Sequence, residues 1–249
     1  MNTLANPQAA GATSRGRLTI DAPMRAFHWL FALSFTGAWI TAESERWRGV
    51  HETLGYAFGG LLAFRLVYGL IGPRQARLAL LWRRASGWGA RLDATRAGTL
   101  AMASAMLLLL AVAAPLVLSG YAGESDWLGL SDQLEELHEF FANTALTLVL
   151  AHLGLIALLS LLRRKNLAAP MLTGRTPGPG ADVVKANRRW LALLVLVSCL
   201  GFVGWQLQQV DAGGDRGAVG ANGADDGTAL HDGPGDGLGD HDGEDDDDD

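Results

Sequence analysis

The stretch HEFFANTALTLVLAHLG, residues 138–154, decides the fold. It belongs to the apolar run Phe140–Leu162, which exceeds the roughly 20 residues that cross a membrane core. His138 and His152 lie fourteen positions apart. On an α-helix that spacing places them within about 40° of each other on one face and about 21 Å apart along the axis. An ionisable side chain inside a membrane segment is costly and by default marks a function.

Four more apolar runs make this chain an all-α integral membrane protein in our prediction. The chain is 49% hydrophobic and 18% charged, and the run Ala97–Gly123 has no polar face, which disfavours the alternative of a very apolar soluble bundle. We predict a four-helix transmembrane bundle plus a fifth, C-terminal transmembrane helix. The five runs are Ala26–Ala42, Thr53–Pro73, Ala97–Gly123, Phe140–Leu162 and Trp190–Val210.

Charge is distributed unevenly along the chain. Residues 211–249 hold fourteen acidic residues and one arginine, and they are otherwise mostly Gly and Ala, so this tail cannot bury apolar surface and should be disordered. Basic residues gather before the first run, between the second and third, and between the fourth and fifth. The positive-inside rule therefore predicts a cytoplasmic N-terminus in a bacterial inner membrane, and five crossings place the acidic tail in the periplasm.

These boundaries divide the chain into five parts. We expect a cytoplasmic N-terminal segment, the four-helix core, a linker, the fifth transmembrane helix and the disordered tail. Their ranges are 1–20, 21–176, 177–187, 188–210 and 211–249. The single Cys199 excludes an intrachain disulfide framework.

Four histidines fall in or beside three of the apolar runs. With the predicted orientation, His51 and His138 lie towards the outer face, and His28 and His152 lie towards the cytoplasm. The axial distance between the two levels is too long for one metal ion, whose ligands lie about 2 Å from it. Two sites with two imidazoles each, inside a helix bundle, suggest two six-coordinate haem irons. The alternative for any one of these residues is a hydrogen-bonding histidine between helices.

Three other residues of the second run are weaker candidates. Arg65 follows His51 by fourteen residues, so it could pair with a haem propionate near the inner site. Alternatively, it extends to the inner membrane interface. Gly55 and Gly59 follow His51 at i+4 and i+8, where small residues admit either a porphyrin ring or a close helix.

The motifs in combination resemble the bacterial cytochrome b-561 family, which includes the b-type cytochrome subunits of nickel–iron hydrogenases. The resemblance covers roughly residues 20–176 and is carried by RAFHW at 25–29, HETLGY at 51–56, FRLVYGLIGPRQAR at 64–77, HEFFAN at 138–143 and NLAAPMLTGR at 166–175. It implies four core helices holding two b-type haems. The family's ligand positions match His28, His51, His138 and His152. The fifth run and the acidic tail depart from the minimal family pattern.

The resemblance and the histidine pattern together predict an electron-transfer protein. We expect a dihaem cytochrome that relays electrons between the quinone pool and a periplasmic c-type cytochrome or hydrogenase, with membrane lipid around it and no nucleic acid. The chain has no CxxC pair and no Rossmann glycines, so we do not expect a stand-alone enzyme. The alternative is a non-redox membrane subunit or transporter that uses paired histidines to carry a metal or protons. The acidic tail is either a solvating extension or an attractor for a cationic partner.

Overall fold

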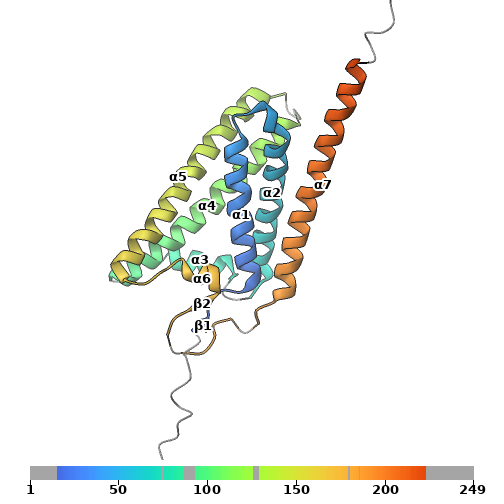
Figure 1. Ribbon diagram of the computed structural model, residues 1–249. Coiled ribbons are helices and arrows are strands. Elements are labelled where there is room, and N and C mark those ends of the chain that lie inside the picture. The colour runs from blue at the N-terminus through green and yellow to red at the C-terminus, as the bar shows by residue number, and fades with distance from the viewer. Residues whose placement is uncertain are drawn as a thin grey trace, which may run out of the picture. The chain divides into compact units, whose positions relative to one another are not determined.

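The computed structural model describes residues 16–73, 76–86, 93–125, 129–178, 180–184 and 186–222, with Ala94 and residues 210–222 described by their backbone only. Helices make up nearly all of this part of the chain (Figure 1). The long helices are α1 (Ala22–Thr41), α2 (Arg48–Ile71), α4 (Ala94–Glu124), α5 (Ser131–Arg163) and α7 (Arg189–Asn222). Short elements join them: β1 (Arg17–Leu18), η2 (Glu45–Trp47), α3 (Leu78–Ala85), α6 (Ala169–Thr173) and β2 (Arg175–Thr176).

Four of the helical segments are long and apolar enough to cross a membrane. They are Glu45–Ile71, Thr95–Glu124, Ser131–Arg163 and Arg189–Gln209. The 20 residues of α1 also suffice in length, since an α-helix rises about 1.5 Å per residue. It is not among the four segments, and it carries Arg25 and His28 in its first two turns. The predicted all-α membrane architecture is confirmed.

The first four long helices form two helical hairpins. Helix α1 packs along α2, and α4 packs along α5, while the two hairpins meet mainly through α2 and α4. Small residues permit this close packing. A Cβ on Gly37 of α1 would lie 2.6 Å from Leu54 of α2, and one on Gly59 of α2 would lie 2.9 Å from Val117 of α4. Gly59 thus serves a helix contact, one of the two roles that the sequence left open.

An aromatic layer forms the centre of the bundle. Phe31 of α1 stacks on Phe58 of α2 with ring centroids 4.0 Å apart, and Phe35 packs on the same ring at 5.9 Å. Ala113 and Leu116 of α4 and Ala145 of α5 complete this buried cluster. On α1 the two phenylalanines lie between the level of His28 and the helix end near Thr41.

The segment before α1 and the linker before α7 are tied together. Strands β1 and β2 pair antiparallel, and Leu18 hydrogen-bonds through its backbone with Asp182 and Val183. Asp21 caps α1 by accepting from the amide of Met24, and it also accepts from the hydroxyl of Tyr68 on α2. We name the segments 16–22 and 174–187 the N-terminal clamp. The sequence predicted only a linker at 177–187 and no contact between the two segments.

Several element boundaries differ from the apolar runs. Helices α2 and α5 begin five and nine residues before their predicted runs, because polar residues extend each helix beyond its apolar part. Helix α7 continues to Asn222, past the predicted end at Val210. The remainder of the acidic tail, residues 223–249, and the prediction of disorder there lie outside the described residues.

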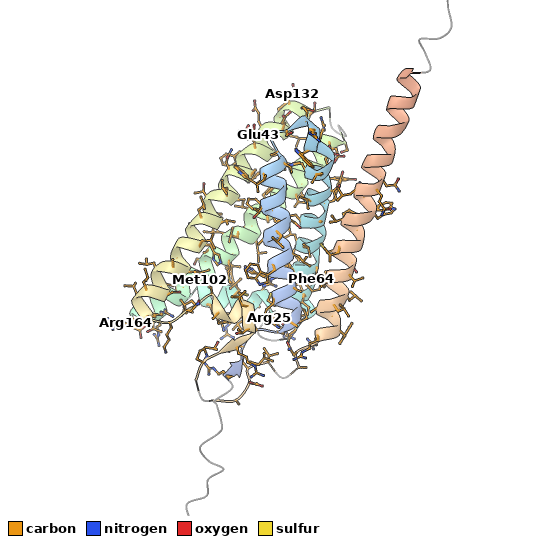
Figure 2. The ribbon with its side chains drawn as sticks, viewed as in Figure 1. Arg25, Glu43, Phe64, Met102, Asp132 and Arg164 are labelled. Carbon is orange, nitrogen blue, oxygen red and sulfur yellow. The ribbon has the colours of Figure 1, made fainter. Side chains whose placement is uncertain are left out.

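The ends of the bundle carry opposite charges. Glu43 and Asp132 lie at one end (Figure 2). Arg25 and Arg164 lie at the opposite end. This separation follows the order of acidic and basic loops in the sequence.

Candidate functional site

The outer pair of histidines lies between the two hairpins. His51 is in the first turn of α2 and His138 is in the second turn of α5. Their ring centroids are 6.2 Å apart, with the ring planes at 79°. A ligating nitrogen lies about 2 Å from its metal ion, and the centre of the imidazole ring lies about 1 Å beyond that nitrogen. Two imidazoles on opposite sides of one iron would therefore have their ring centroids about 6 Å apart. The observed separation therefore fits bis-imidazole ligation of a single iron.

Each ring of this outer pair is held by a backbone carbonyl oxygen. Nδ1 of His51 lies 2.8 Å from the carbonyl oxygen of Ala38, and Nδ1 of His138 lies 3.0 Å from that of Leu116. A carbonyl oxygen only accepts, so Nδ1 carries the proton in both rings and donates it. Each Nε2 then keeps its lone pair free for a metal. This arrangement of a ligating histidine and an outer acceptor is common in metalloproteins.

Local backbone geometry explains why the first of these carbonyls is available. The amide of Ala42 donates to Trp39 rather than to Ala38, because the last turn of α1 tightens. The carbonyl of Ala38 thereby loses its usual helical partner and accepts from His51 instead.

On α4 the fit around His138 depends on a glycine. A Cβ on Gly120 would lie 2.8 Å from Cε1 and 2.9 Å from Nδ1 of His138, so any larger residue would push the imidazole aside. The hydroxyl of Ser119 is 3.5 Å from the same Nδ1. Sequence reasoning missed both residues. The only signal was the SG pair near the end of an apolar run, which is also typical of ordinary helix packing.

The inner pair consists of His28 on α1 and His152 on α5. The two side chains are close enough to interact electrostatically. His152 is only 9% exposed, and its buried Nδ1 lacks a hydrogen-bond partner within the described residues. A buried ring nitrogen without a partner is costly, and a bound group in contact with Nδ1 would relieve that cost. Helices α1 and α5 do not pack closely along their lengths, so side chains rather than backbones meet between them.

The structure thus brings the four histidines together in the pairs that their predicted membrane depths gave, His51 with His138 and His28 with His152. His138 and His152 lie on one continuous helix, 33 residues long. Beside His51, a Cβ on Gly55 would meet no atom within 4 Å, so one face of α2 is open next to the imidazole. The residues present therefore fit a large planar cofactor at each level. Within the described residues no group of three or more His, Cys, Asp or Glu side chains could hold a metal ion.

Arg65 lies buried near the end of α2, where it makes a hydrogen bond to the chain beyond that helix. Its side chain is buried, at 8% exposure, and its Nη1 donates to the carbonyl oxygen of Ala76 at 3.1 Å. Asp21 is near enough to interact with its charge. Arg65 therefore holds the connection between α2 and α3 against the bundle. Its proposed contact with a haem propionate stays a prediction.

A family model described as prokaryotic cytochrome b561 matches residues 19–174, which is more than half of the chain. The matched region begins just before α1 and ends at the last residue before β2, so it contains both histidine pairs. Helix α7 lies beyond it. No curated protein and no solved structure matches the chain.

Proposed function

The chain belongs to the prokaryotic cytochrome b561 family, and from this premise we propose that it is a dihaem cytochrome that relays electrons between the quinone pool and a periplasmic redox partner. The family makes the chain a multi-pass membrane b-type cytochrome that functions in electron transfer. Our proposal adds the number of haems, their ligands and the orientation of the bundle in the membrane.

Two histidine pairs at two levels of one bundle support the proposal. His51 and His138 would hold an outer haem, and His28 and His152 would hold an inner one. When bound, a b-type haem supplies one-electron chemistry at its iron. Each haem would be held by two imidazoles, a set of ligands that favours electron transfer over oxygen binding. The carbonyl groups of Ala38 and Leu116 orient the outer imidazoles, and the layer of Phe31 and Phe58 keeps water out of the space between the levels.

The orientation belongs to the proposal as well. The basic end of the bundle, which contains Arg25 and Arg164, would face the cytoplasm. The outer haem would then lie near the periplasm and exchange electrons with a c-type cytochrome or a hydrogenase. Quinone would bind near one of the two haems. The acidic tail, which begins within α7 at residue 211, would reach the periplasmic side, where a cationic partner would meet it.

Haem content of purified variants tests the proposal. A pyridine haemochrome assay should give about two b-type haems per chain for the unmodified protein. His51→Ala and His138→Ala should each lose the same haem, and the double variant should still retain one. His28→Ala and His152→Ala should each lose the other haem. The two single variants of one histidine pair should lose the same absorption band and the same reduction potential.

His231 provides a matched control, because it lies in the tail beyond the described residues. His231→Ala should keep both haems. One haem per chain in the unmodified protein, or loss of both haems from each single variant with the fold retained by circular dichroism, would contradict the pairing.

A further inference from the structure

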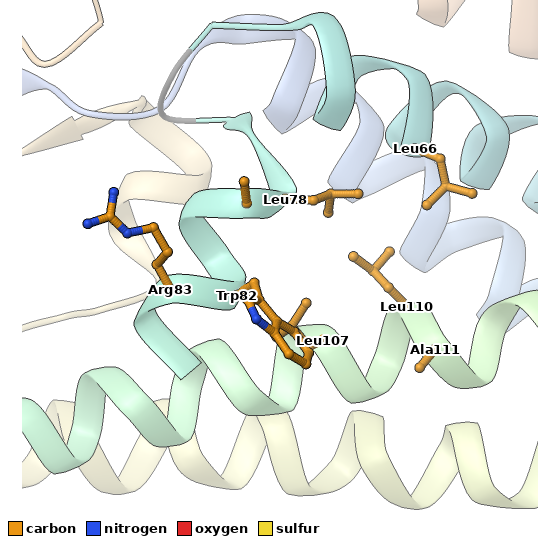
Figure 3. Close-up of a pocket in the computed structure, with 8 residues that line it drawn as sticks. Leu66, Leu78, Trp82, Arg83, Leu107, Leu110 and Ala111 are labelled. Carbon is orange, nitrogen blue, oxygen red and sulfur yellow. The ribbon is translucent and has the colours of Figure 1, made fainter. Parts of the chain in front are cut away.

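A groove lies between α2, α3 and α4, on a different side of α4 from the histidines. Its volume is about 500 Å³. Leu66 of α2, Leu78 of α3, and Leu107 and Leu110 of α4 form its walls (Figure 3). Because α2 and α4 are spanning helices, whatever fills the groove must be soluble in lipid.

Helix α3 is fixed in place along this groove. Arg65 donates to the carbonyl of Ala76, and Nε of Arg77 donates to that of Gly72 at 3.2 Å. Leu78 packs against Gly69, where a Cβ would lie 2.6 Å from its Cγ. These contacts hold the short helix where the chain turns from α2 to α4, at one face of the membrane. The groove is therefore a built feature of the fold.

One cationic residue stands at the end of the groove. The stem of Arg83 borders it, and its guanidinium extends away from the leucines, towards the end where α4 begins (Figure 3). Within the described residues this guanidinium has no side-chain hydrogen bond or ion pair. Trp82 lies beside Leu107 and is 66% exposed, as is usual for an indole at a membrane interface.

We propose that the groove binds one acyl chain of an anionic phospholipid, with the lipid phosphate on the guanidinium of Arg83. Apolar walls suit a hydrocarbon chain, and the polar end offers a forked donor that matches phosphate. A neutral quinone would fill the same walls but would leave the positive charge without a counter-ion. The inference does not rest on the haem ligands or on the direction of electron flow.

Lipid retention tests this site. The protein is reconstituted into nanodiscs of equal parts phosphatidylglycerol and phosphatidylcholine, returned to mild detergent, and analysed for bound lipid by native mass spectrometry. The unmodified protein should retain phosphatidylglycerol about fivefold over phosphatidylcholine, as expected for one interfacial arginine. Arg83→Gln should abolish this preference. Arg84→Gln, the matched control one residue further along, should preserve it.

A second variant addresses the groove itself. Ala111 is exposed and lies at the end of the groove away from Arg83, so Ala111→Phe should fill that end and reduce the retention of both lipids, while haem absorbance reports that the bundle still folds. Equal retention of the two lipids by the unmodified protein would overturn the proposal, as would equal effects of the two arginine variants. Full retention in Ala111→Phe would place the lipid elsewhere. If a short-chain quinone displaces the bound lipid, and binds Arg83→Gln as well as it binds the unmodified protein, the groove is a quinone site.

Discussion

At the scale of single residues, the outer site depends on groups that have no metal-binding chemistry of their own. The carbonyl oxygens of Ala38 and Leu116 hold His51 and His138 in one tautomer. Neither carbonyl is distinguished by residue type, because each becomes an acceptor only through tertiary packing. Helical periodicity is local, and it placed His138 and His152 on one face from sequence alone. The two acceptors and Gly120 require the packed bundle.

Gly120 gives the first prediction at this scale. Gly120→Ala should displace the imidazole of His138, because the new methyl group would lie within 2.9 Å of the ring. Overpacking of this kind costs about 1–3 kcal/mol, so affinity for the outer haem should fall about fivefold or more. The inner haem should remain. A pyridine haemochrome assay measures the haem content. Visible spectra recorded at each step of a redox titration show which haem remains.

Gly123 of the same helix is the matched control. A Cβ there would meet Leu134 at 3.6 Å, which is ordinary van der Waals contact. Gly123→Ala should therefore keep the full haem content. If Gly120→Ala also keeps both haems, the contact between α4 and the imidazole does not govern ligation.

At the scale of elements, the apolar runs predicted the long helices but not what joins them. Hydropathy detects the lipid-facing length, so it missed the polar first turns of α2 and α5, which extend beyond it. The two-residue strands β1 and β2 are too short for any periodic signal. The N-terminal clamp is formed by residues more than 150 positions apart, such as Leu18 and Asp182. Local sequence patterns do not carry that information.

Asp21 links the clamp to the bundle and gives the second prediction. It is 2% exposed, caps α1 and accepts from the hydroxyl of Tyr68. Asp21→Ala removes the cap and leaves a buried hydroxyl without its acceptor, so the protein should lose about 2–4 kcal/mol of stability. The free energy of unfolding is measured by titration with denaturant in detergent, with circular dichroism as the signal.

Asp93 allows a close comparison, because it caps α4 in the same way by accepting from the amide of Arg96 at 2.7 Å, but at an exposed position. Asp93→Ala should cost only about 1 kcal/mol. Similar losses for the two alanine variants would mean that burial and Tyr68 add nothing to the cap of α1.

At the scale of the whole molecule, topology depends on whether α1 crosses the membrane. Four segments satisfy length and hydropathy, and α1 is not among them. Its packing along α2 and its contribution to the central aromatic cluster argue for a full crossing. Five crossings separate the two termini, whereas four would place both on the same side.

Reporter fusions distinguish these two arrangements. With five crossings and a cytoplasmic N-terminus, alkaline phosphatase fused to the C-terminus of the full chain should be active, since the enzyme folds only outside the cytoplasm. The same reporter fused after Gly174, before α7, should be inactive, because the chain there is still on the basic side. Green fluorescent protein fusions at the two positions should give the reverse pattern. If α1 instead lies on the cytoplasmic surface of the membrane, every one of these signals inverts, and His28 could not share a depth with His152 inside the bundle.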